Sequence, residues 1–169
     1  MSPSRKEQET CRGTSMVRTD TSGLIRGLLV AHIWIVATGI PLLDKLLPLE
    51  RVLRLLTPRR SFRLYRGTDP VLIGKIARRR LQRPIHMRRR ACLRLSLVIY
   101  HFARLAGAEA VFHIAVFAPS VDSRRLHAHS WVTAGNLCLC EPPEGPACEI
   151  MQYGAGHPRT KTYNAVRIV

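Results

Sequence analysis

The segment from Leu95 to Ala118 constrains the fold most, because its hydrophobic pattern changes from a helical to a strand period within a few residues. Apolar side chains first recur at the spacing of one helix face, and this pattern stops at Gly107. They belong to Leu95, Val98, Ile99, Phe102, Leu105 and Ala106. Ala110 to Ala118 is then almost wholly apolar, with the β-branched and aromatic residues typical of a buried strand. The sequence therefore predicts a helix over 93–106 and a central strand over 110–118.

Shorter patterns predict two further helices and a hairpin. Residues 46–56 form an amphipathic helix whose apolar stripe consists of Leu49, Val52, Leu53 and Leu56. A second helix is predicted over 70–81, with Asp69 as its N-cap and Pro70 in its first position. Residues 127–134 alternate between polar and apolar, and Gly135-Asn136 predicts a turn into a short strand over 137–141.

The N-terminal third of the chain has two parts of opposite character. Residues 1–22 are polar and charged without an apolar period, which predicts a mobile tail. From Gly23 the chain becomes apolar, and the run from Gly27 to Leu43 carries no charge. This run is shorter than the roughly 20 residues that span a bilayer, and Pro41 would end or kink it. We predict a helix buried against the domain or a partner, with a membrane-surface helix and a true span as alternatives.

Charge and cysteine content narrow the class of protein. Lys and Arg number 27 against 11 Asp and Glu, so the formal net charge of +16 favours nucleic acid, anionic lipid or an acidic peptide as partner. An apolar content of 46% excludes collagen-like and wholly disordered chains. Five cysteines are an odd number, and the N-terminus lacks the apolar core of a signal peptide. Both features favour a reducing cytoplasm over a disulfide scaffold.

Three residues could together perform nucleophilic chemistry. Cys92 opens the predicted helix, where free backbone N–H groups, the helix dipole and the arginines at 88–90 favour a thiolate. His129 in a predicted strand could act as base and then as acid, and Glu141 just past the hairpin could hold its imidazole in one tautomer. Singly, each has a plain structural explanation, as a core cysteine, a strand histidine and a solvated carboxylate. Their order and the residues around them point to catalysis.

The residues around Cys92 and His129 resemble those of a known family. ACLRLSL at 91–97, an apolar strand, AHSWV at 128–132 and an acidic residue after a Gly-containing turn are similar to the leader peptidases of lasso-peptide biosynthesis, the B proteins. The resemblance covers residues 86–143 and implies an α+β, transglutaminase-like and papain-related fold. It gives Cys92, His129 and Glu141 the nucleophile, base and orienting-acid positions, with Glu141 where aspartate is usual. It also implies a catalytic domain over 67–169, after the tail at 1–22 and a helical extension at 23–66.

The resemblance implies a cysteine peptidase that removes the leader from a ribosomally made precursor peptide through a thioester. The cleavage step needs no cofactor, whereas a partner macrolactam synthetase uses ATP to close the ring. Residues 1–66 lack the strand-rich pattern of the family's leader-recognition domain, so we expect a separate recognition protein. The expected partners are therefore the precursor peptide, the recognition protein and the synthetase. Residues 23–56 could add contact with a membrane surface or an exporter.

Two other functions stay open on the sequence. Four side chains offer a tetrahedral zinc site, although their spacing is not that of a common zinc finger: His127, His129, Cys138 and Cys140. The positive charge suits a nucleic-acid-binding module. Its arginines are not interleaved with aromatic residues, however, so a nucleic-acid partner is not expected.

The register of the hairpin separates the enzyme from the zinc site. A two-residue loop at Gly135-Asn136 would put the two histidines and the two cysteines on one face of the sheet. A three-residue loop over 134–136 would instead pair His129 with Glu141, with their Cα atoms about 4.5–5.5 Å apart. We predict the longer loop, with Asn136 in the left-handed conformation that such a loop requires.

Overall fold

The computed structural model describes residues 23–81, 91–117 and 127–154, which form four helices and four strands. The helices are α2 (Gly23–Leu46), α3 (Leu49–Leu56), α4 (Pro70–Leu81) and α6 (Ala91–Leu105). The strands are β1 (Ala110–Phe117), β2 (Ala128–Ala134), β3 (Leu137–Cys138) and β4 (Ala147–Gly154). The predicted tail at 1–22 and the arginines at 88–90 lie outside the described residues.

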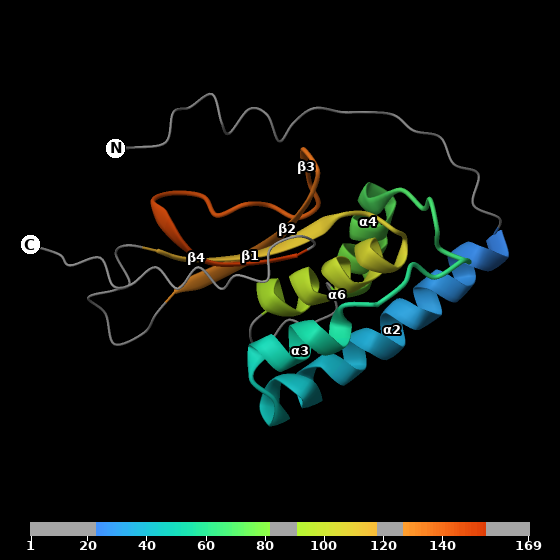
Figure 1. Cartoon of the computed structure of the whole chain (residues 1–169), viewed down its shortest axis with the longest axis horizontal. Helices are drawn as coiled ribbons and strands as arrows, with labels where there is room; N and C mark the ends of the chain where they lie inside the picture. Colours follow the sequence, from blue (N-terminus) through green and yellow to red (C-terminus); the bar gives the residue numbers. More distant parts are fainter. Residues whose placement is uncertain (1–22, 82–90, 118–126, 155–169) are drawn as a thin grey trace, which may run out of the picture.

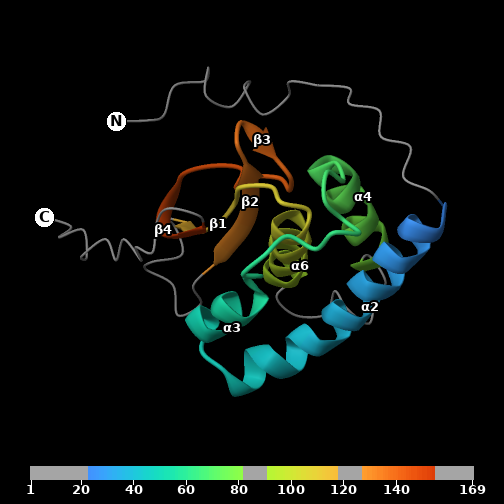
Figure 2. The ribbon, with the colours of Figure 1, turned by 45° about the vertical axis from the view of Figure 1, so that its right-hand side comes forward.

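Helix α6 lies at the centre of the molecule, between the sheet and the other helices (Figure 1). The sheet has the order β3-β2-β1-β4, and each pair of neighbours is antiparallel. Strands β1 and β2 contact α6 from one side, and α2, α3 and α4 also contact it, as the turned view in Figure 2 shows. The prediction of a helix packed on a small antiparallel sheet, with helices added before it, is confirmed.

The core surrounds α6 because that helix is apolar on nearly all sides. Leu97, Ile99 and Phe102 are fully buried, and Phe112 of β1 and Val132 of β2 meet them from the sheet. Burial of this kind stabilises a fold by about 1.5–3 kcal/mol for each large apolar side chain. The apolar periodicity that predicted the helix and the strand therefore also identified the centre of the core.

Two polar side chains of α6, those of Tyr100 and His101, have hydrogen-bond partners at the end of α3. The Tyr100 hydroxyl lies 2.9 Å from Thr57 Oγ1, and burial raises the pKa of Tyr100. Nδ1 of His101 donates to the carbonyl of Leu56 at 2.6 Å, and burial lowers the pKa of His101. Both contacts tie the C-terminal half of α6 to the end of α3.

The predicted N-terminal helix is α2, and one of its faces is buried. Leu29, Ile33, Ala37 and Ile40 are almost completely inaccessible, and α2 contacts α6, α4 and α3. The opposite face is exposed and apolar, with 69% of Ile35 and 68% of Leu46 accessible. In the described part of the chain, α2 is the one helix long and apolar enough to cross a membrane, and 22% of its most apolar window is buried. The predicted packing of this helix against the domain is therefore confirmed for one face.

We expect sodium carbonate extraction to release the full-length protein from membranes of the cells that make it. Insertion of α2 across a bilayer would expose the buried face, which includes Ile33 and Ile40, and would cost about 1.5–3 kcal/mol for each large side chain withdrawn from the core. Immunoblots of pellet and supernatant after extraction measure the outcome. Retention in the pellet together with a known integral protein would show that α2 spans the membrane.

Candidate active site

Cys92 occupies the first turn of α6, as predicted. The helix begins at Ala91, and the Cys92 side chain is half-buried with a free thiol. The first turn of a helix has backbone N–H groups without partners inside the helix, and its dipole favours negative charge. Residues 92 and 96 lie one turn apart on the same face, so the position of the thiol follows from how Ser96 is held.

A hydrogen bond between α6 and β2 holds Ser96 in place. Its hydroxyl donates to the carbonyl oxygen of Ser130 at 2.7 Å, and both residues are buried. Ser96 follows Cys92 by one turn, and Ser130 is the neighbour of His129. The contact therefore fixes the helix that carries the candidate nucleophile against the strand that carries the candidate base.

His129 lies near the start of β2 and is oriented by the main chain. Its Nε2 is 2.8 Å from the carbonyl oxygen of Glu141. A carbonyl oxygen only accepts, so Nε2 carries the hydrogen and, in the neutral ring, Nδ1 is the unprotonated nitrogen. The bond selects the tautomer that a base requires, a task that carboxylates perform in comparable sites.

Cys92, His129 and Glu141 line one cavity of about 220 Å³. The other lining residues are Arg78 and Leu81 from α4, Leu95 and Ser96 from α6, Ser130 and Cys140. Cys92 and His129 also line a second cavity of about 310 Å³, together with Leu49, Leu93, Ile114, Ala128 and Ser130. Among the described residues no hydrogen bond joins the Cys92 thiol to the imidazole. The structure thus brings the three predicted residues to one site, and Cys92 and His129 line two cavities there.

The predicted contact between the Glu141 carboxylate and His129 is wrong. The Glu141 carboxylate instead pairs with Arg78, with 2.5 Å between Oε1 and Nη1, and 75% of the Glu141 side chain is exposed. Glu141 meets the imidazole through its peptide carbonyl. An ion pair this exposed contributes about 0–1 kcal/mol to stability.

The register of the hairpin explains this difference. Thr133 pairs with Cys138 and Ala134 with Leu137, so the loop has two residues and the predicted three-residue loop is wrong. Gly135 has a φ of 56°, a conformation that glycine adopts without the steric cost of a side chain. The shorter loop moves Glu141 one position out of register with His129.

The cysteines of the hairpin do not join the histidines in a metal site, although the register is the one that zinc required. Strand β3 ends at Cys138, so its alternation of faces stops there, and Cys140 turns into the core. Its sulfur accepts the Val132 N–H at 3.2 Å, and burial raises the pKa of Cys140. The described residues contain no group of three or more His, Cys, Asp and Glu that could hold a metal ion.

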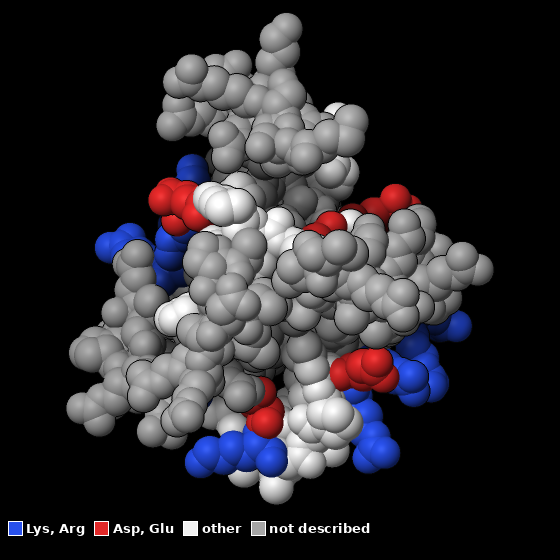
Figure 3. Space-filling model, turned by 90° about the vertical axis from the view of Figure 1, so that its left-hand side faces the viewer, with Lys and Arg blue, Asp and Glu red and all other residues white. Residues whose placement is uncertain are grey.

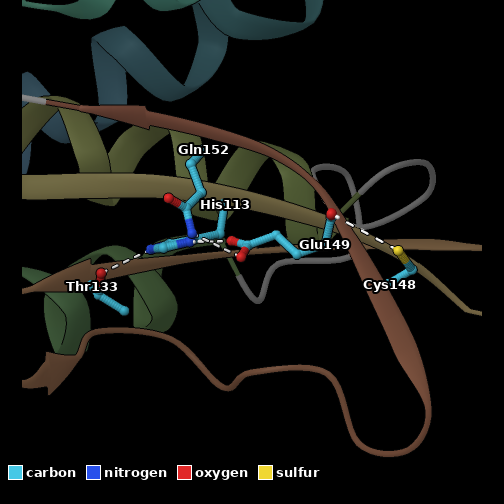
Figure 4. Close-up of polar contacts among 5 residues, drawn as sticks. All are labelled: His113, Thr133, Cys148, Glu149 and Gln152. Atoms are coloured by element: carbon cyan, nitrogen blue, oxygen red, sulfur yellow. Dashed lines mark hydrogen bonds and ion pairs between the residues drawn. The ribbon is translucent and has the colours of Figure 1, made fainter. Parts of the chain in front are cut away.

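A second polar network lies beside the candidate base and was not predicted from the sequence. His113 Nδ1 is 2.5 Å from Glu149 Oε1, and His113 Nε2 is 2.8 Å from Thr133 Oγ1 (Figure 4). Gln152 donates to the other oxygen of Glu149 at 2.8 Å. Both nitrogens of His113 are therefore occupied by partners from β2 and β4.

This network supports His129 through Trp131. The rings of His113 and Trp131 are stacked at 5.0 Å and 8°, and those of Trp131 and His129 at 6.4 Å and 20°. Trp131 thus lies between the two histidines, with the His113 side held by Glu149. The alternation of His129, Trp131 and Thr133 along one strand is the sequence signal that could have identified this face. The partners Glu149 and Gln152 were missed because β4 was not predicted.

Comparison with protein families agrees with this geometry. Residues 75–148 match the family described as the transglutaminase-like superfamily. This segment is a transglutaminase-like domain. It begins within α4, contains Cys92, His129 and Glu141, and ends in β4, so all parts of the candidate site except Leu49 belong to it. The curated proteins and the solved structures gave no match to this chain.

A helix and a strand of this segment meet at the cavity. In this structure α6 packs on the small antiparallel sheet and presents its first turn to the neighbouring strand β2. Here that turn carries Cys92 and the strand carries His129. The class of fold predicted from the sequence is confirmed, and it is generally associated with cysteine chemistry.

Proposed function

We propose that this protein is a cysteine peptidase that removes the leader from a ribosomally synthesised lasso precursor peptide. One observation carries the peptidase proposal: the first turn of α6 and the start of β2 bring Cys92 and His129 to one cavity in a transglutaminase-like domain. The resemblance of ACLRLSL and AHSWV to the lasso leader peptidases supports the choice of substrate.

In the proposed reaction, the sulfur of Cys92 attacks the carbonyl carbon at the end of the leader. Nδ1 of His129 takes the thiol proton and returns it to the nitrogen of the core peptide as the C–N bond breaks. The leader is then bound as a thioester until water, deprotonated by the same imidazole, releases it as a carboxylic acid. The backbone N–H of Cys92 is a candidate donor to the oxyanion in both halves of the reaction.

The proposal includes partners. The described part of the extension, residues 23–66, is helical and contains no strand, which supports recognition of the leader by a separate protein. The freed core peptide would pass to an ATP-dependent macrolactam synthetase, while the cleavage step itself uses no cofactor. The exposed apolar face of α2 offers a surface for one of these proteins, an exporter or a membrane.

The experiment that tests the proposal is a reconstitution with purified components. The full-length protein is mixed with a precursor peptide encoded beside its gene and with the adjacent recognition protein, and products are identified by mass spectrometry. We expect one cut that yields an intact leader and an intact core. A precursor that stays uncut under conditions where the recognition protein binds its leader would contradict the proposed substrate.

We expect Glu141→Gln to keep the rate of cleavage within about twofold of the native protein. The substitution removes the charge that pairs with Arg78 but leaves the peptide carbonyl that holds Nε2 of His129. The loss of an exposed ion pair is expected to cost at most about 1 kcal/mol of stability. Measurement of kcat and KM for this variant and for Arg78→Gln separates the ion pair from catalysis. A fall in kcat of a hundredfold or more for Glu141→Gln alone would show that the carboxylate takes part.

A further inference from the structure

Three arginines from two helices converge on a cleft that the proposed reaction does not use. Arg26 and Val30 of α2 and Ile76, Arg79 and Arg80 of α4 line a space of about 460 Å³. No acidic side chain is among these lining residues. In the described part of the chain, no ion pair involves Arg26, Arg79 or Arg80. The cleft therefore concentrates positive charge that the described carboxylates do not neutralise.

The helix dipole explains why Arg79 and Arg80 stand at the end of α4, but it does not explain why Arg26 of α2 lines the same cleft. Arg78, Arg79 and Arg80 form the last turn of α4, where cations interact favourably with the helix dipole. The dipole does not require Arg26 to approach from another helix. Like charges at one cleft repel one another, and a bound anion would remove that cost. Guanidinium groups are well suited to bind carboxylates through paired hydrogen bonds.

The cleft lies across the end of α4 from the candidate active site. Arg78 and Leu81 line the cavity that contains Cys92, whereas Ile76, Arg79 and Arg80 line the cleft. The width of a helix is about 10–12 Å, a distance that three or four residues of extended peptide cover. A peptide that leaves the cavity and crosses this helix end would place a side chain among the three arginines.

We infer that Arg26, Arg79 and Arg80 form a subsite for acidic side chains of the peptide substrate, three or four residues from the bond that is cut. The inference rests on the proposed function in one respect, that the substrate is a peptide. It adds a chemical class, because a peptide with glutamate or aspartate at that distance would be preferred over a neutral one. The same cleft would accept a phosphate group, so nucleic acid is the alternative occupant that the experiment must distinguish.

The high net charge of the chain makes a matched control necessary. Figure 3 shows basic side chains spread along the edges of one face, several of them beside an acidic one. Any acidic peptide will therefore bind weakly to many places on this surface. Arg59 and Arg60 form an exposed pair outside the cleft, and their replacement removes the same charge as replacement of Arg79 and Arg80.

The experiment measures binding without cleavage. The full-length Cys92→Ala variant is titrated against a fluorescein-labelled peptide with three consecutive glutamates, and against the same peptide with three glutamines, by fluorescence anisotropy at about 150 mM salt. We expect the glutamate peptide to bind more tightly than the glutamine peptide. The double substitution Arg79→Gln with Arg80→Gln should weaken the affinity for the glutamate peptide about tenfold. The double substitution Arg59→Gln with Arg60→Gln should change this affinity less than twofold. Thermal unfolding of each variant checks that the fold is retained.

Three results would overturn the inference. An equal loss of affinity for the glutamate peptide in both double variants would mean that its binding depends only on the net charge of the protein. Arginine-dependent binding of a single-stranded oligonucleotide, without such binding of the glutamate peptide, would assign the cleft to nucleic acid. If the glutamate peptide binds as expected but the reconstituted protein cuts no precursor, only the proposed function fails. If the precursor is cut and Arg79→Gln with Arg80→Gln leaves KM unchanged, only the subsite fails.

Discussion

Replacement of Cys92 with alanine is expected to abolish cleavage of the precursor, with a fall in kcat on the order of 10⁴-fold or more. The sulfur is the atom that forms the thioester, and no other described cysteine lines both cavities beside His129. Alanine at the first turn of α6 preserves the helix, so stability should change little. Liquid chromatography with mass spectrometry of timed reactions measures the residual rate.

Two other cysteines provide matched controls for that variant. Cys148 is exposed and Cys138 is half-buried outside the cavity, so Cys148→Ala and Cys138→Ala should cleave at the native rate. Cys140 is a poorer control because its sulfur accepts a buried N–H, and its loss would leave that donor unsatisfied. Native activity in Cys92→Ala, or inhibition of the native protein by a zinc chelator, would refute the thioester mechanism.

Replacement of His129 with alanine should lower kcat by about 10²–10⁴-fold while the precursor still binds. Among the described residues that line the cavity, His129 has the one imidazole, and the carbonyl of Glu141 holds it in a fixed tautomer. His129→Gln retains a donor to that carbonyl but has no basic nitrogen, so it should be about as slow as the alanine variant. The measurement is kcat separately from KM, with leader binding followed by anisotropy.

A nearby histidine serves as the control for this second variant. His127 is exposed and lies two residues from His129, outside both cavities that Cys92 lines. His127→Ala should leave kcat unchanged. A similar loss for the His127 and His129 variants would point to a general effect on β2 and would contradict the assignment of the base.

The elements of the fold that could be predicted are those that one local signal defines. The predicted bounds of α4 match the structure because Asp69 caps it, with Oδ1 accepting the Val71 N–H at 2.9 Å. The α6 segment was found from its apolar periodicity and the β1 segment from its almost continuous apolar run, and both patterns arise from burial in the core. Cys92 and His129 were placed correctly because the helix α6 and the strand β2 were predicted from the sequence.

The parts that could not be predicted depend on contacts between distant residues. Strand β4 has a register shift against β1, between the pairs Ile114–Met151 and Ala115–Glu149, and this irregularity interrupts the alternation of faces in its sequence. The register of the hairpin depended on whether its loop has two residues or three, and both loop lengths are compatible with the sequence. The peptide carbonyl of residue 141 can orient the imidazole of His129 whatever side chain that residue carries, so this role could not be predicted from the sequence.

That carbonyl has a consequence for how the protein can change over time. A group that every amino acid carries cannot be deleted by a point mutation, so the tautomer of His129 is insulated from substitutions at position 141. The side chain there is then free to vary with the charge of the substrate at the mouth of the cavity, where it now meets Arg78. Substitutions at this position could therefore change the substrate specificity without changing the tautomer in which His129 is held.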